Sequence, residues 1–274
     1  MKNIIPLCFA IAIISSCAAQ ETKIKGDKDV LSVTENLPSG INTIQIEEGI
    51  EVKLVQAKTD NYVLTTDRNL VSVIDFTVKD SVLTIKTNLK ITQSKELEVY
   101  LKLENPEHII LKNDAKIETP GLIETDNFSL AAYQSSKFDL NVKTLKSQVT
   151  LLDNSGGELN LDGEKITVMM KNRTDLKGDF TVNTAIVNLQ ESAEFSTDGK
   201  TDNLTLTGED RSEFKGRKFE GDNMNVTLNK HAKATIYARD NLTIFAKDRA
   251  SIEVYGKPEI TVKELSDKAE ITKK

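Results

Sequence analysis

Polar side chains recur at nearly equal intervals through the second half of the chain, where they could line up as ligands or acids. The first such column, called column A, consists of Asn113, Gln134, Asp153, Asn172, Glu191, Asp210, Lys230 and Asp248. Stacked carboxylates on a regular scaffold can hold calcium or supply the acid and base that cleave a polysaccharide. Glu191 and Asp210 are the only acids at successive positions of column A, so they are the candidate catalytic pair.

The residue after each member of column A forms column B, which contains Arg173, Arg211, His231 and Arg249. A lyase would place such a base beside a carboxylate. The mixture of amides, acids and a lysine in column A instead favours solvated turn residues that pair between neighbouring repeats.

Other site chemistries find little support. The only histidines, His108 and His231, lie far apart in the repeat order, so neither a histidine metal site nor a Ser-His-Asp site is expected. No glycine-rich phosphate loop follows a strand and opens a helix. We therefore expect no cofactor and no metal.

The elements that carry these columns belong to a repeat. Its apolar anchor residues are Ile109, Leu130, Val149, Val168, Val187, Leu206, Val226 and Ile244, separated by 18 to 21 residues. The sixth residue after every anchor is Ala, Ser or Thr, which fits a crowded corner. A period near 20 predicts a right-handed parallel β-helix, a β-solenoid of about eight or nine coils with two or three short strands each.

Two further patterns share this period. Apolar residues two positions before the anchor, such as Phe128 and Leu204, predict core pairs with the anchors. Asp-Asn pairs stand four and three residues before several anchors, as at Asp126-Asn127 and Asp202-Asn203. Because Asp and Asn tolerate left-handed backbone, we expect these pairs to form corners.

The first 17 residues are typical of a lipoprotein signal peptide. Lys2 is followed by an apolar stretch, and Ile14-Ser15-Ser16-Cys17 resembles a bacterial lipobox, whose cysteine is lipidated. The alternative is an ordinary signal peptide with a chance cysteine at its end. Cys8 lies within the removed segment, so a chain that starts at Cys17 has no other thiol. Ala18 at the next position resembles lipoproteins sorted to the outer membrane.

The composition of the full sequence of 274 residues limits the possible partners and the division into domains. The formal net charge of -6 and the lack of a basic block argue against a nucleic-acid partner. Residues 18–40 are polar and predict a tether, residues 41–105 show the period-two pattern of a β head, and residues 106–274 carry the repeats. Gly49, between two alternating runs of the head, predicts a tight turn or a bulge.

Three motifs of the head resemble a known family. They are Gly49-Ile50 with the alternating run to Gln56, then Asp67-x-Asn69-Leu70, then Asp80-Ser81-Val82-Leu83-Thr84-Ile85. They resemble the opening of the auto-transporter adhesin "head GIN domain" family, secreted or lipid-anchored proteins of Bacteroidetes-type bacteria. The resemblance covers residues 41–258 as one domain. It implies a β-solenoid and brings no established catalytic residues.

These observations together predict a lipid-anchored protein of the cell envelope that acts as a non-catalytic adhesion or display scaffold. Its expected partners are the membrane, through lipid on Cys17, and a protein or glycan ligand. Two alternatives stay open: a carbohydrate-active lyase or hydrolase on the same scaffold, and a structural or sensing partner of another envelope protein. The ligand, the oligomeric state and the face of the outer membrane are not specified by the sequence.

Overall fold

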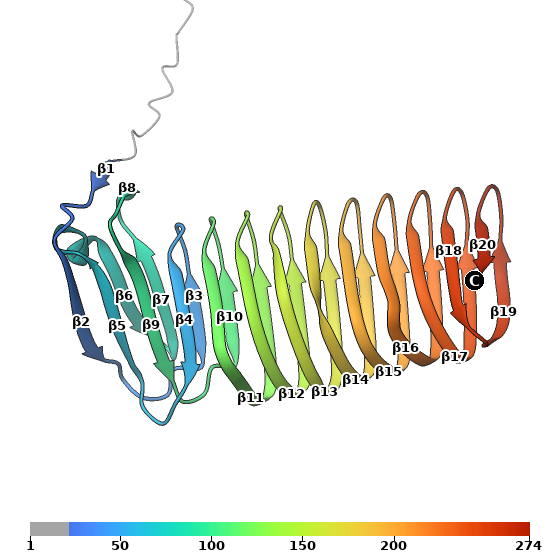
Figure 1. Cartoon of the computed structure of the whole chain (residues 1–274), viewed down its shortest axis with the longest axis horizontal. Coiled ribbons are helices and arrows are strands. Elements are labelled where there is room, and N and C mark those ends of the chain that lie inside the picture. Colours follow the sequence, from blue (N-terminus) through green and yellow to red (C-terminus); the bar gives the residue numbers. More distant parts are fainter. Residues whose placement is uncertain (1–21) are drawn as a thin grey trace, which may run out of the picture.

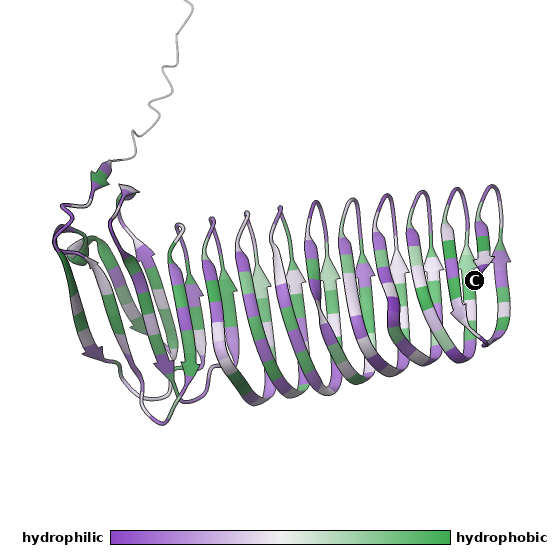
Figure 2. Cartoon of the chain, viewed as in Figure 1, coloured by the Kyte–Doolittle hydropathy of each residue, from purple (hydrophilic) through white to green (hydrophobic). Residues whose placement is uncertain are grey.

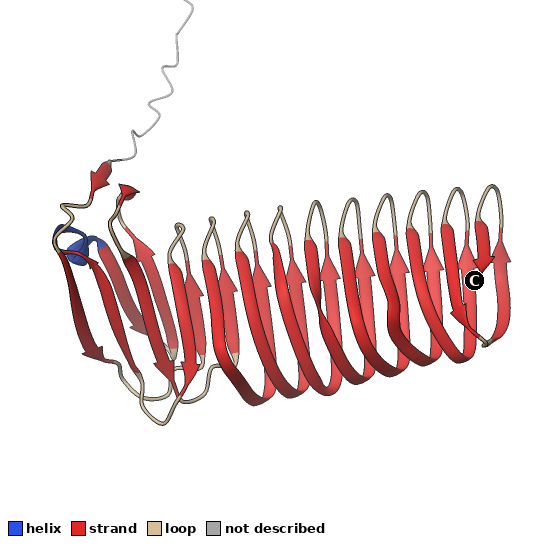
Figure 3. Cartoon of the chain, in the orientation of Figure 1, coloured by secondary structure: helices blue, strands red, loops and turns tan. Residues whose placement is uncertain are grey.

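The chain folds into a β-solenoid rod with a β-rich head at one end (Figure 1). The computed structural model describes residues 22–274. It contains a solenoid of about nine turns and confirms the predicted fold class. Strands dominate both parts, and turns occupy the edges of the rod (Figure 3).

Two sets of elements make up the described chain. The head contains β1 (Lys23–Lys25), β2 (Val30–Asn36), β3 (Thr43–Ile46), β4 (Glu51–Gln56), β5 (Asn61–Asp67), the 3-10 helix η1 (Arg68–Val73), β6 (Ile74–Lys79), β7 (Val82–Thr87), β8 (Lys90–Gln93) and β9 (Leu97–Leu103). The rod continues with β10 (His108–Leu111), β11 (Lys116–Ala132), β12 (Lys137–Leu151), β13 (Gly156–Met170), β14 (Asp175–Leu189), β15 (Glu194–Gly208), β16 (Glu213–Leu228), β17 (Lys233–Ala246), β18 (Ser251–Gly256), β19 (Glu259–Leu265) and β20 (Glu270–Lys273).

Each central coil consists of one long strand that bends, and this differs from the two or three short strands predicted. Strands β11 to β17 contain 14 to 17 residues and pair in parallel with both neighbours. Parallel pairing continues around the bend. Between β11 and β12 only one residue of each strand, Asp126 and Leu145, is left unpaired there. The anchors stack on one another, as in Leu130–Val149–Val168, which confirms the repeat frame.

The core is a continuous apolar column inside the rod. The anchors and the residues two positions before them, such as Leu204 and Leu206, are buried, which confirms the predicted core pairs. Alternation of apolar and polar residues along each strand is visible in Figure 2. Phe180, Phe195 and Phe214 pack edge to face in successive coils, with ring centroids 5.3 and 5.6 Å apart. These rings fill the interior and offer no platform to a sugar.

The small residue six positions after each anchor is buried at the base of a turn. Ala115, Ser136 and Ala193 are at most 1% exposed, and the other members of this set are equally buried. The N–H of Ala193 closes the turn by donating to Gln190 O at 3.2 Å. A larger side chain at this point would enter the packed column, which explains the restriction to Ala, Ser and Thr.

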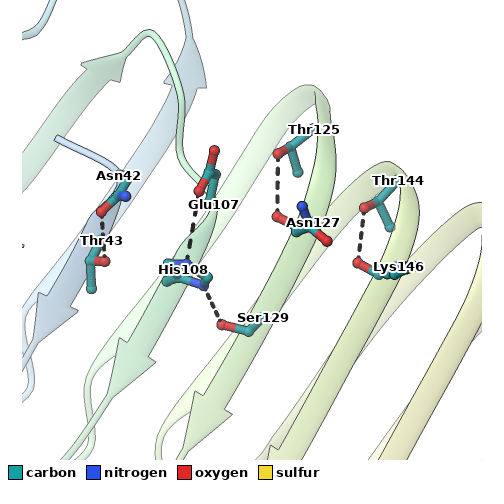
Figure 4. Close-up of polar contacts among 9 residues, drawn as sticks. All are labelled: Asn42, Thr43, Glu107, His108, Thr125, Asn127, Ser129, Thr144 and Lys146. Carbon is teal, nitrogen blue, oxygen red and sulfur yellow. Dashed lines mark hydrogen bonds and ion pairs between the residues drawn. The ribbon is translucent and has the colours of Figure 1, made fainter. Parts of the chain in front are cut away.

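The Asp-Asn pairs lie at the opposite bend, but not in left-handed conformation. None of the four pairs has a positive φ, so the prediction that they form corners through left-handed backbone was wrong. Threonine hydroxyls brace this bend instead: Thr125 and Thr144 each donate to the carbonyl oxygen two residues on, at 3.2 and 3.1 Å (Figure 4). Positive φ occurs in column A, at the other edge of the rod.

The described part of the predicted tether, residues 22–40, is folded onto the head. β2 pairs antiparallel with β5, although four of its seven side chains are exposed. The Asp67-x-Asn69-Leu70 motif fastens this segment: Asn69 accepts the N–H of Asp27 at 3.0 Å and donates to Lys25 O at 2.8 Å. An edge strand with this much exposure has a polar sequence, which made it look like a linker.

The two ends of the rod differ. At the head, β3 and β4 pair with β10 and β11, so the solenoid sheet runs directly into the strands of the head. At the other end, β19 and β20 form the last coil. Its Val262 and Leu265 are 47% and 49% exposed, because no further coil covers them.

We expect Ala193→Leu to destabilise the rod by about 1–3 kcal/mol, because the added atoms overpack a filled column. The free energy of unfolding in urea measures this change. Ala131→Leu is the matched control, since Ala131 lies on β11 with its side chain on the outer face and half-buried. Equal stability of both variants would show that the space beneath the turn is open.

Candidate functional site

The two polar columns lie side by side on a row of two-residue turns, which we call the turn ridge. Each turn joins two strands of the rod, and columns A and B supply its two central residues. In the turn of Asp210 and Arg211, for example, Ser212 N–H donates to Glu209 O at 3.2 Å. Both columns therefore face solvent, and the structure brings the predicted residues together as neighbours along one edge.

The turns adopt two backbone conformations along the ridge. Four turns have positive φ at both central residues: 47–50, 112–115, 133–136 and 152–155. From turn 171–174 to the C-terminus only the first central residue has positive φ, as at Asn172 and Glu191. These are the patterns of type I′ and type II′ turns, which differ by a flip of the central peptide group. Narrow loops give way to wider ones along the top of Figure 1 at this point.

The residue type in column B changes at the same point. Positive φ is tolerated by Gly, Asn, Asp and other small polar residues, and the first four turns have Gly49, Asp114, Ser135 and Asn154 at this position. From Arg173 onward, long side chains or a histidine occupy column B in every turn except that of Ser192. The peptide flips there and gives column B negative φ. Ser192 keeps the orientation of its neighbours, to which it is hydrogen-bonded.

The flip reverses the hydrogen bonds between turns. In the type I′ part, Ser135 N–H donates to Asp153 O in the following turn at 2.9 Å. In the type II′ part, Ser192 N–H donates to Asn172 O in the preceding turn at 3.2 Å. A trans peptide points its N–H and C=O in opposite directions. The two parts of the ridge therefore have opposite backbone polarity.

Two donors face each other where the polarity changes. Asp153 O is turned toward Ser135, so Asn154 N–H on the same peptide points toward turn 171–174. Asn172 O is turned toward Ser192, so Arg173 N–H points back toward turn 152–155. Across residues 22–274 neither N–H reaches a backbone carbonyl. We call the space between them the donor gap.

Side chains bridge the two turns beside the donor gap. Asn172 Nδ2 donates to Asp153 Oδ1 at 2.5 Å, and Arg173 Nε donates to Asn154 Oδ1 at 3.0 Å. Turn 171–174 is also open, since no bond from Thr174 N–H to Lys171 O closes it in the described chain. A groove of about 640 Å³ starts at these turns and runs along the ridge to Lys230 and His231.

Glu191 and Asp210 lie in this groove but are engaged by lysines. The side chain of Glu191 is 48% exposed and lies 3.7 Å from Lys171 Nζ, while that of Asp210 is 36% exposed and accepts a bond from Lys230 Nζ at 2.6 Å. This bond holds the pKa of the Asp210 carboxyl below its ordinary value, against the opposing effect of partial desolvation. A general acid needs a raised pKa, so the setting of Asp210 suits ion pairing between turns.

Part of column B carries basic side chains that form no salt bridge. The side chains of Arg211, His231, Arg249 and, in the last turn, Lys268 form no hydrogen bond and no ion pair within residues 22–274. The neighbouring acids of the ridge accept hydrogen bonds from backbone N–H groups of the preceding turns. Asp248 accepts Lys230 N–H at 3.0 Å, and Asp267 accepts Asp248 N–H at 3.3 Å.

The other predicted groups lie elsewhere. His108 is at the opposite bend, where its Nδ1 is 2.7 Å from Ser129 Oγ (Figure 4), so the structure does not bring the two histidines together. Cys17 lies outside the described residues. Within residues 22–274 no group of three or more His, Cys, Asp or Glu side chains could hold a metal ion. In the same part of the chain, no helix has the length and apolarity to cross a membrane.

The donor gap was not predicted from columns A and B, because it is made of backbone groups. One signal was available in the sequence. The column B residue changes from small and polar at Asn154 to long at Arg173, and this change coincides with the flip of the peptide.

We expect Lys230→Gln to raise the pKa of Asp210 toward its ordinary value of 3.8, because the variant removes the ammonium group that stabilises the carboxylate. Since the folded-state pKa of Asp210 is depressed, its contribution to stability is present above the unfolded pKa and is lost as pH falls through the folded pKa. NMR titration of the carboxyl carbon measures the shift. Lys233→Gln, an exposed lysine in the next strand, should leave this pKa unchanged.

Several solved structures share the fold of this chain. A protein described as a putative adhesin from Parabacteroides distasonis ATCC 8503 has 17% identity and a TM-score of 0.71, covering 92% of this chain and 99% of its own. A putative adhesin from Parabacteroides merdae ATCC 43184 has 16% identity and a TM-score of 0.61, with the same coverage. A protein described as a putative lipid binding protein, also from Parabacteroides distasonis ATCC 8503, has 14% identity and a TM-score of 0.62, again over 92% and 99% of the two chains. At these identities the likeness shows the fold alone.

The chain matches a family model but no curated protein. A family model described as "Putative auto-transporter adhesin, head GIN domain" matches residues 41–164 and again residues 149–258. The two matches overlap at residues 149–164 and together cover residues 41–258. Together they span most of the chain, which therefore belongs to the head GIN domain family of putative auto-transporter adhesins.

Proposed function

We propose that this protein is a lipid-anchored adhesion scaffold of the cell envelope, which holds its turn ridge toward a protein or glycan partner without catalysing a reaction. The observation that carries the proposal is the turn ridge itself. It is a continuous polar edge that follows the rod, and its candidate catalytic acids Glu191 and Asp210 are paired with lysines. The adhesin description of the family supports surface association.

The shape of the molecule suits display. Coils spaced by about 4.8 Å give nine turns a length of roughly 40 Å. Cys17 precedes β1 by only six residues, so a lipid on Cys17 would hold the head close to the membrane. The later coils would then extend away from it. Side chains on such a rigid support lose little conformational freedom when they bind, which favours affinity.

The anchor can be tested directly. Cys17→Ser should prevent incorporation of labelled fatty acid and leave a soluble or uncleaved precursor, because the proposed lipid is attached to this sulfur. Cys8→Ser is the matched control and should be labelled normally. Labelled fatty acid in the Cys17→Ser protein would refute the lipobox interpretation.

The double substitution Glu191→Gln with Asp210→Asn separates a scaffold from an enzyme. For a scaffold we expect unchanged folding and retained attachment to surfaces coated with matrix proteins or glycans, because the two acids pair with neighbouring lysines and take no part in a reaction. Attachment is compared between cells that carry the wild-type and the variant chain. Cleavage of an acidic polysaccharide by the purified wild-type chain, lost in Glu191→Gln, would establish the lyase or hydrolase instead. Attachment to neither surface, together with capture by another envelope protein, would indicate the structural or sensing role.

A further inference from the structure

We propose that the turn ridge binds a linear acidic polysaccharide, with one carboxylate of the polymer in the donor gap and others along the unpaired cations of column B. The inference rests on the proposed adhesion function and names the chemical class of its ligand. It depends on two separate observations, one from the backbone and one from side chains.

The donor gap requires an acceptor. Asn154 and Arg173 direct two N–H groups into one space, and two donors cannot bond to each other. Successive backbone N–H groups that converge are a common way to bind an anion. A carboxylate has two oxygens and can accept one bond from each N–H. A water molecule could also accept both bonds, but it would not benefit from the adjacent charge of Arg173.

Arg173 strengthens this preference for an anion. Its Nε donates a hydrogen bond to Asn154 Oδ1, whereas its two terminal amino groups make no hydrogen bond in the described chain. They can therefore form charge-assisted bonds to the same ligand, which are stronger than bonds between neutral groups. Asp153, a carboxylate that lines the same groove, already accepts a bond from Asn172.

The row of free cations extends the site toward the C-terminus. Arg211, His231, Arg249 and Lys268 occupy successive turns, so they repeat at about the strand spacing of 4.8 Å. The acids between them accept hydrogen bonds within the ridge, from Lys230 Nζ to Asp210 and from backbone N–H groups to Asp248 and Asp267. The central residues of these four turns comprise three acids, four lysine or arginine side chains and His231, on a chain whose formal net charge is -6.

The regular spacing selects the ligand class. A polyuronate carries one carboxylate on each sugar of a stiff chain, so its charges repeat on a scale similar to that of the turns. Nucleic acid fits less well, because the described ridge has no row of aromatic side chains on which bases could stack. An acidic peptide would lose more conformational entropy on binding than a stiff sugar chain. Since the site is exposed, binding should weaken as salt is added.

Titration of the ¹⁵N-labelled full chain with oligogalacturonate tests the site. We expect the amide signals of Asn154 and Arg173 to shift with the binding curve. Replacing Arg211, Arg249 and Lys268 together by Gln should weaken binding roughly tenfold or more, because three charge-assisted contacts are removed. The matched control replaces Lys143, Lys146 and Lys165, which are exposed on other strands, and should change the Kd by less than about twofold.

Several outcomes would overturn the inference. Binding without movement of the two amide signals, or equal loss in the control variant, would exclude the ridge. Equal binding of a neutral glucan would exclude charge recognition, and equal binding of oligoglutamate would assign the site to acidic peptides. If cells carrying the chain still attach to surfaces while oligogalacturonate does not bind, the inference fails and the adhesion function stands. If attachment is absent as well, the adhesion function fails too.

Discussion

Every internal coil of this rod must hydrogen-bond to a coil on each side, and the rest of the structure depends on that condition. It keeps the anchors in register and aligns the turns in a single row. It also makes the orientation of each turn peptide depend on its neighbours. Ser192 illustrates the constraint: it is small enough for either turn type, yet it adopts the type II′ orientation of the turns around it.

Inward and outward side chains are subject to different restrictions. Residues such as Leu206 and Ala193 face a packed interior, where volume changes are costly. Columns A and B face solvent and only need to permit the turn. Their residues are free to vary in charge, as Asn113, Asp210 and Lys230 show within one column. This division agrees with solved structures that share the fold at 14–17% identity, since recognition can change on the ridge while the rod persists.

Much of the fold could be predicted, because residue types recur at fixed positions in each repeat. The anchors, the apolar residues two positions before them and the small residue beneath each turn all record packing, and the structure confirms them. The continuity of each strand around its bend was not predicted, since a single unpaired residue such as Asp126 leaves little trace in the sequence. The left-handed residues were assigned to Asp-Asn pairs, whereas column A adopts that conformation. For the site, Glu191 and Asp210 could be placed in one column, whereas the change of backbone polarity is marked only indirectly, by the change from Asn154 to Arg173 in column B.

The change of turn type is a boundary between two conformations of coupled repeat units. At such a boundary the backbone groups of the two facing turns cannot pair, and the order of the two turn types decides whether donors or acceptors are left unpaired. Type I′ followed by type II′, as between Asn154 and Arg173, brings two donors together. The reverse order would bring two carbonyl oxygens together and would favour a cation. A solenoid could therefore acquire, lose or move an ion site through one substitution in column B, with no change in its core.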